Sequence, residues 1–272
     1  MKFIRNFPSL LVAALAAFTA NNAMADTIGA ANSAQINYNI NYAAVDANGA
    51  TVSEYRIFDG NGPRVGNSYT APTESNNYAT GLNANSVAVF FFQLPDLGSV
   101  SAPFSTATLS IGFSAYAGGG QNGIIADIYG LGVQATKTAQ NSMYFVGAND
   151  TTGGVTKIAD DFLSSSSYSA NSLITTSVAS SALADYLNAA YANGANAGKY
   201  VVLRISPESA SQLTGASGYN LASFSNATIA PFITYSVAAI PEPSAIAAIF
   251  GLAVLGCAGI LRMRRNAVGK SC

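Results

Sequence analysis

The chain has no histidine and no tryptophan, and charged residues make up only 9% of its 272 residues. An ordinary soluble domain carries roughly 25% charged residues. The absence of histidine excludes Ser-His-Asp triads, zinc sites built on histidine, and general bases of the imidazole type. The formal net charge of −1 argues against a nucleic-acid partner, because such proteins present a basic surface. Half of the residues are apolar, which excludes the highly charged class of disordered chains.

Cysteine is also scarce, and its two positions are both near the C-terminus. Cys257 lies inside an apolar run, and Cys272 is the last residue. The region 26–239 contains no cysteine, so it forms no internal disulfide. Its stability must therefore come from packing.

The first residues have the pattern of a secretory signal. Lys2 and Arg5 give a positive start, 10–18 is an apolar run, and Ala23 and Ala25 place small residues where a signal peptidase needs them. The apolar run is too short to cross a bilayer, which takes about 20 residues. We predict a signal peptide over 1–25, cleaved after Ala25, so that the Sec translocon and signal peptidase are partners.

The second long apolar run, 244–261, contains no charged residue. At about 1.5 Å per residue a helix of this length spans roughly 27 Å, close to the hydrocarbon thickness of a bilayer. The basic tail 262–272 follows, with Arg262, Arg264 and Arg265 at its start. Such a cluster stays cytoplasmic. We therefore predict a transmembrane helix over 244–261, with the preceding region outside the cytoplasm.

Between the central region and this helix stand Pro241, Glu242 and Pro243. Two prolines around one residue exclude both a helix interior and a central strand. Pro-Glu-Pro, an apolar helix and an arginine cluster together resemble the PEP-CTERM sorting signal of Gram-negative bacteria, here over 240–272. The resemblance implies retention in the inner membrane and recognition of the three motif residues by an exosortase, a membrane-embedded cysteine transpeptidase. The domain order is then signal peptide, exported domain 26–239 and sorting signal.

The exported domain is predicted to consist mainly of strands. Residues 35–42 alternate polar and apolar side chains, the period-two pattern of a half-buried strand, and 51–58 can return antiparallel. The run 87–94 is apolar on both faces, which predicts a central strand covered on its outer side. Further strands are expected at 107–113, 124–131, 172–178, 200–205 and 232–237.

One short amphipathic helix is expected, because Leu183, Leu187 and Tyr191 recur at helical spacing. We expect this apolar stripe to cover the outer face of the strand at 87–94. Many strands, one helix and no alternation of strands with helices predict an all-β fold, an antiparallel β-sandwich.

The stretch 89–113 contains Phe-Gln-Leu-Pro-Asp-Leu and then Ser-Thr-Ala-Thr-Leu-Ser-Ile. It is similar to jelly-roll surface domains related to carbohydrate-binding modules, in which such segments join two core strands. The resemblance implies a jelly-roll form of the sandwich. These are packing motifs, so they carry little information about function.

Carboxylates are the first candidates for chemistry, since a glycosidase needs two of them roughly 5–9.5 Å apart. The exported domain holds three glutamates, Glu54, Glu74 and Glu208, and the adjacent pair Asp160 and Asp161. Adjacent side chains in an extended segment point to opposite faces. Solvation and turn formation account for these acids, so no catalytic residue is assigned and the chain is not expected to be an enzyme.

Oxygen-rich turns at 46–49 and 59–62 could donate ligands to calcium. Asp-Gly and Asn-Gly pairs are also good turn formers in their own right. No cofactor is predicted and no metal ligand is assigned. A structural calcium ion is kept as an alternative, with its ligands unknown.

Sugar binding is favoured by the 14 tyrosines, whose rings can stack on pyranose faces. Tyr69, Tyr78, Tyr116 and Tyr168 lie in polar, loop-like surroundings and are the ones expected to be exposed. Most tyrosines of a β-sandwich belong to its core or pair across strands, so no individual residue is assigned to a glycan site.

Taken together, the sequence predicts a non-enzymatic protein of the cell surface or extracellular matrix. It passes through an inner-membrane intermediate, and its family context associates it with exopolysaccharide and biofilm. The alternatives are a glycan-binding module with a tyrosine-based site and a carboxylate-based hydrolase.

Overall fold

The structure, a computed structural model, describes residues 25–45, 51–60, 62–70, 82–116, 124–164, 172–175, 180–208 and 218–237. These residues fall in one compact unit, Ala25–Val237. Its strands are β1 (Ala25–Val45), β2 (Thr51–Asp59), β3 (Arg64–Thr70), β4 (Leu82–Gln93), β5 (Phe104–Tyr116), β6 (Ala126–Gln134), β7 (Thr156–Leu163), β8 (Leu173–Thr175), β9 (Tyr200–Pro207), β10 (Gly218–Leu221) and β11 (Phe232–Val237). The helices are α2 (Ser181–Tyr191) and the 3₁₀ turns η1 (Asn141–Met143) and η2 (Ala192–Gly194).

The predicted all-β class is confirmed, and every strand pair among the described residues is antiparallel. The strands expected at 51–58 and 232–237 correspond closely to β2 and β11. The other expected strands overlap observed ones, and 51–58 returns antiparallel to β1 as predicted. Three strands, β3, β7 and β10, were not predicted.

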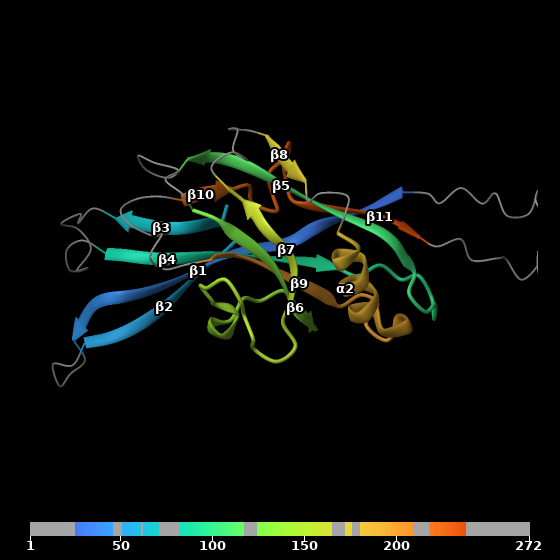
Figure 1. The fold of residues 1–272 in the computed structure, drawn as a ribbon, viewed down its shortest axis with the longest axis horizontal. Helices are drawn as coiled ribbons and strands as arrows, with labels where there is room; N and C mark the ends of the chain where they lie inside the picture. The colour runs from blue at the N-terminus through green and yellow to red at the C-terminus, as the bar shows by residue number, and fades with distance from the viewer. Residues whose placement is uncertain are drawn as a thin grey trace, which may run out of the picture. The chain divides into compact units, whose positions relative to one another are not determined.

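The strands form two layers, which are joined through β1 and also through β5, whose partner β10 pairs with β3 (Figure 1). The first residues of β1 pair with β11, which pairs with β5. After a bulge between Ala30 and Asn32, β1 continues into the second layer, where it lies between β2 and β4. From β4 this layer extends through β9 and β6 to β7. The principal core lies between the layers, because it combines residues of β5 and β11 with residues of β4, β6 and β9.

Helix α2 packs against this principal core and contributes side chains to it. The stripe formed by Leu183, Leu187 and Tyr191 is fully buried, so the amphipathic helix is confirmed. The hydroxyl of Tyr186 accepts from the Gly132 N–H at 2.8 Å and donates to the Val202 carbonyl at 3.0 Å. These bonds fix the helix against β6 and β9.

The expected position of the helix, on the outer face of the strand 87–94, is wrong. Helix α2 packs in the principal core together with Phe90 and Phe92. The outer side of β4, which Phe91 faces, is covered instead by the segment 137–155, through Ala139 and Met143. Because side chains alternate along a strand, Phe91 points to the face opposite that of Phe90 and Phe92. A loop whose sequence has no recognisable periodicity covers Phe91 on that face.

The segment 137–155 is held to the outer face by Arg204 of β9, whose side chain is only 1% exposed. The Arg204 guanidinium donates to the Met143 carbonyl at 3.1 Å and pairs with the Asp150 carboxylate at 2.7 Å. It also lies over the rings of Tyr129 and Phe145, at 4.9 and 5.2 Å from their centroids. Burial alone would raise the pKa of Asp150, but hydrogen bonds from Thr152 and Arg204 lower it below its ordinary value.

Replacing Asp150 by Asn is expected to destabilise the protein by about 3–5 kcal/mol, because it leaves the Arg204 charge buried without a counter-ion. Urea unfolding of the full chain in mild detergent, followed by circular dichroism, measures this loss. The matched control is Asp185→Asn, at an exposed position of α2, which should stay within about 0.5 kcal/mol of the wild type. Equal stability of the two variants would contradict the role given to Arg204.

Candidate functional site

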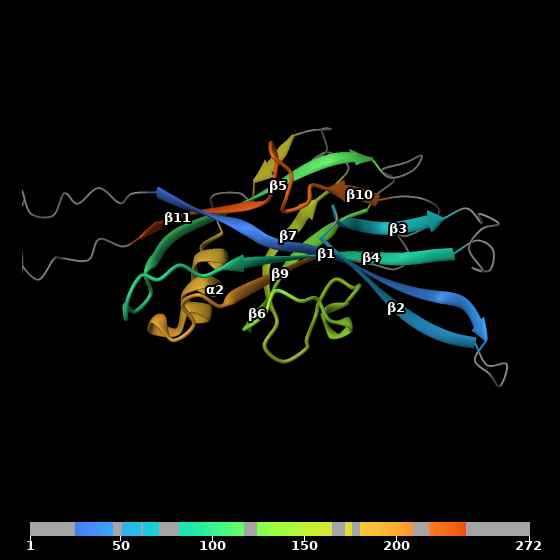
Figure 2. The same ribbon diagram turned by 180° about the vertical axis from the view of Figure 1, so that it is seen from behind.

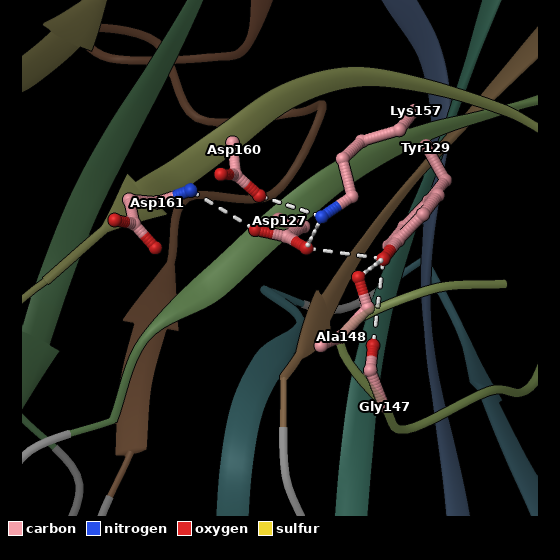
Figure 3. A network of polar contacts seen from close by, with 7 residues as sticks. All are labelled: Asp127, Tyr129, Gly147, Ala148, Lys157, Asp160 and Asp161. Atoms are coloured by element: carbon pink, nitrogen blue, oxygen red, sulfur yellow. Dashed lines mark hydrogen bonds and ion pairs between the residues drawn. The ribbon is translucent and has the colours of Figure 1, made fainter.

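Four carboxylates come together on the outer face of the second layer. Asp127 lies in β6, Asp160 and Asp161 lie in β7, and Glu208 directly follows β9. One carboxylate oxygen of each lies within 4.8 Å of those of the other three. Figure 3 shows the three aspartates of this carboxylate cluster with the polar side chains around them.

An irregularity between β6 and β7 creates the carboxylate cluster. Ala126 is opposite Leu163 while Ile128 is opposite Ala159, so Asp127 alone faces three residues of β7. Within that bulge Asp161 has a φ of +52°, and its N–H donates to the Asp127 carboxylate at 2.9 Å. The expectation that the side chains of Asp160 and Asp161 point to opposite faces is therefore wrong, because the bulge interrupts the extended geometry on which it rested.

Asp127 is the buried centre of the carboxylate cluster, with a side chain that is 0% exposed. Its carboxylate accepts from the Tyr129 hydroxyl at 3.0 Å and pairs with the Lys157 ammonium at 2.7 Å (Figure 3). Burial and the charge of Asp127 raise the pKa of Tyr129 to about 12, so this hydroxyl remains a hydrogen-bond donor at neutral pH. It donates to Asp127 from a ring that Arg204 covers on one side.

A single ammonium serves two of the carboxylates, since Lys157 lies 2.7 Å from Asp127 and 2.6 Å from Asp160. Burial would lower the pKa of Lys157, but its hydrogen bonds to the two aspartates raise it above its ordinary value. Four carboxylates against one lysine leave the carboxylate cluster with excess negative charge.

The excess charge is visible at Glu208, which is half-buried at the end of β9. Burial first, and then the neighbouring Asp127, Asp161 and Asp160, raise the pKa of Glu208 to about 7. The Glu208 N–H donates to the Ile125 carbonyl at 3.0 Å, which fixes the backbone that carries it. The carboxylate cluster therefore takes up a positive charge, here a proton, near neutral pH.

Two kinds of chemistry use such a group of carboxylates: acid–base catalysis and the binding of a hard cation. A glycosidase pair requires both carboxyl groups to reach the sugar. Asp127 has no exposed side-chain surface and its oxygens already accept three hydrogen bonds or ion pairs. The cation-binding interpretation fits this buried arrangement better.

Of the residues singled out in the sequence, Glu208, Asp160 and Asp161 belong to the carboxylate cluster, and Glu54 lies apart from them in β2. Asp59, in one of the turns considered for calcium, accepts a hydrogen bond from Asn32 at 3.3 Å. The other calcium turn, at 46–49, and a further set of residues lie outside the described part of the chain: Glu74, Tyr78, Tyr168, Ala23, Pro241, Glu242, Pro243, Arg262, Arg264 and Arg265.

Of the remaining residues, Tyr69 and Tyr116 lie in β3 and β5. Ala25, the residue before the predicted signal-peptidase cleavage, is the first residue of β1. The predicted transmembrane helix 244–261 lies outside the described residues. Within those residues, no helix has the length and apolar character needed to cross a membrane.

The structure adds a group of tyrosines that sequence reasoning did not single out. The rings of Tyr38, Tyr55 and Tyr144 lie 4.8–5.5 Å from one another, and Tyr55 is 38% exposed. Tyr38 and Tyr55 are directly opposite in the β1–β2 register. The predicted hairpin of 35–42 and 51–58 could have indicated that Tyr38 and Tyr55 lie side by side. The sequence held no such signal for Tyr144, which comes from the segment 137–155.

Comparison with known protein families finds no family model that matches the chain, and comparison with curated proteins finds no similar sequence. The function is therefore inferred from the residues of the chain itself.

The pKa of Glu208 predicts how stability depends on pH. A carboxyl group whose pKa is higher in the folded state, about 7 against 4.5, stabilises the fold below the lower value, and this contribution is lost as the pH rises through the higher one. Between about pH 5 and pH 8 we expect the wild type to lose about 1–3 kcal/mol from this group. Urea unfolding in chelator-treated buffer measures this loss. Glu208→Gln should make the free energy of unfolding less dependent on pH over this range. If the pH profile of this variant equals that of the wild type, Glu208 is not the group responsible.

Proposed function

We propose that this chain is an exported, non-catalytic protein of the cell surface or extracellular matrix, sorted through its C-terminal segment. In this proposal helix 244–261 holds the chain in the inner membrane and an exosortase then processes it at Pro241, Glu242 and Pro243. The observation that carries the proposal is the order of Pro-Glu-Pro, an uncharged apolar run and an arginine cluster in the last part of the sequence. The signal-peptide pattern over 1–25 supports the same route.

The geometry of the exported domain is compatible with attachment at one end. Ala25 at the start of β1 is paired with Ser236 near the end of β11. The start of β1 and the end of β11 therefore lie at one end of the domain, while the end of β1 and the end of β3 lie at the other (Figures 1 and 2). A domain built this way, with the jelly-roll form that the sequence resemblance implies, leaves its far end available to exopolysaccharide or other matrix material.

The sorting proposal is tested by Glu242→Ala and by deletion of 262–272. Both variants should accumulate as unprocessed protein in the inner membrane, because the first removes the charged residue of the motif and the second removes the cytoplasmic arginines. Cell fractionation and mass spectrometry of the two termini measure the outcome. Asp185→Ala, an exposed acid in α2, is the matched control and should be processed normally. Normal release of both test variants to the surface would refute the proposal.

A second candidate function, glycan binding, is favoured by the tyrosine group at Tyr38, Tyr55 and Tyr144. Tyr55 and Ile57 lie on the same face of β2, because they are two residues apart, and both are more than one third exposed. An exposed aromatic ring beside an apolar side chain can receive the apolar face of a sugar ring.

A glycan array with the purified chain tests this candidate. Specific binding to one class of glycan, lost in Tyr55→Ala but kept in the distant Leu173→Ala, would support a glycan site on this face. Leu173, with 43% exposure, is a comparable exposed apolar residue in β8. If the chain binds no glycan, or if both variants lose binding equally, there is no glycan site at these tyrosines.

A further inference from the structure

A buried hydroxyl next to the carboxylate cluster lacks a hydrogen-bond partner. Ser206 of β9 is 0% exposed, and its Oγ makes no hydrogen bond to any residue that the structure describes. A buried polar atom without a partner costs about 1–3 kcal/mol, and a bound water or ion at this oxygen would remove that cost.

The strand register places Ser206 on the face that carries the carboxylate cluster. Ser206 is directly opposite Asp127 in the β6–β9 pair, so the two side chains share one face of the sheet. Glu208 follows two residues later along the same strand direction and contributes its carboxylate to the same group. Ser206 is therefore the residue of β9 that stands next to Asp127, the centre of the carboxylate cluster.

We propose that Asp127, Asp160, Asp161 and Glu208 bind one divalent cation of the calcium class, with the Ser206 hydroxyl as an additional oxygen donor. All the donors are hard oxygens, and the chain has no histidine. This donor set disfavours zinc and copper, which prefer nitrogen and sulfur ligands. Calcium accepts six to eight oxygens in irregular geometry, whereas magnesium demands near-ideal octahedral coordination and uses one or two carboxylates.

Lys157 is the competitor of the cation in this proposal. Its ammonium lies between Asp127 and Asp160, where a cation shared by these carboxylates has to lie. The lysine side chain is 29% exposed, so it can withdraw to solvent when the metal binds. Glu208 gives up its proton in the same exchange, since a carboxylate coordinates a metal in its ionised form.

The competition gives the proposal a directional test. Removing a ligand in Asp161→Asn or Glu208→Gln should weaken binding by about tenfold or more, because affinity follows the number of charged ligands. Removing the competitor in Lys157→Gln should instead tighten binding by about tenfold. Asp161→Asn replaces an exposed side chain by one of the same shape, so it tests the ligand role without disturbing the core.

The measurement is tyrosine-sensitised terbium luminescence of the full chain in mild detergent after treatment with a chelator, with calcium as the competitor. The chain has no tryptophan, and the Tyr129 hydroxyl lies 3.0 Å from Asp127, so a terbium ion at the site is close to a tyrosine donor. We expect calcium to displace terbium with a Kd of about 10⁻⁴–10⁻³ M, the range of extracellular modules. At about ten times the Kd, calcium should raise the Tm by about 3–6 °C.

Asp185→Asn in α2 is the matched control and should bind like the wild type. The proposal is overturned if calcium displaces no terbium signal, if magnesium at the same ionic strength raises the Tm equally, or if Lys157→Gln and Asp161→Asn change the affinity in the same direction. Circular dichroism of each variant confirms that it is folded before binding is measured. Because the measurement uses purified protein, its outcome does not depend on the sorting route.

Discussion

The burial of one carboxylate, Asp127, sets the constraint that the outer face of the second layer has to satisfy. A charge with no access to water is tolerated only when it is paired and hydrogen-bonded. The fold meets this demand with a lysine and a backbone N–H from the neighbouring strand β7 and with the Tyr129 hydroxyl from β6 itself. The bulge of β7 contributes to this stabilisation through the backbone, because it turns the Asp161 N–H toward the Asp127 carboxylate.

The same constraint links the carboxylate cluster to the segment that covers the sheet. The Tyr129 hydroxyl shares its one proton between Asp127 and the Ala148 carbonyl, which lies 2.9 Å away, and its ring lies under the Arg204 guanidinium. Arg204 in turn holds Asp150 and the Met143 carbonyl. A row of polar groups therefore runs from Asp160 to Asp150 across three strands. These contacts hold the irregular segment 137–155 to the sheet.

The sequence allowed the general class of the fold to be predicted, but it did not reveal where the carboxylates meet. The period-two pattern of 35–42 and the helical stripe through Leu183 reflect burial of one face, which the spacing of apolar residues along the sequence records. Strand β7 shows no such pattern, since Phe162 and Leu163 are both buried next to the charged pair at its bulge. The positive φ of Asp161 is imposed by its contact with Asp127, a residue 34 positions earlier, and no local signal encodes such a contact. Strand β3 is mostly polar and strand β10 has only four residues, so neither has a recognisable sequence pattern. They are strands because they pair with β4 and β5, respectively.

The position of β11 has a mechanical consequence for the proposed attachment through the C-terminal segment. This strand lies between β1 and β5, with antiparallel pairing on both sides. Hydrogen bonds in such ladders run perpendicular to the strands, so a pull along β11 loads both ladders in shear instead of opening them one bond at a time. Under flow or drag on the distant end of the domain, rupture then requires many bonds to break together, which makes this attachment resistant to force.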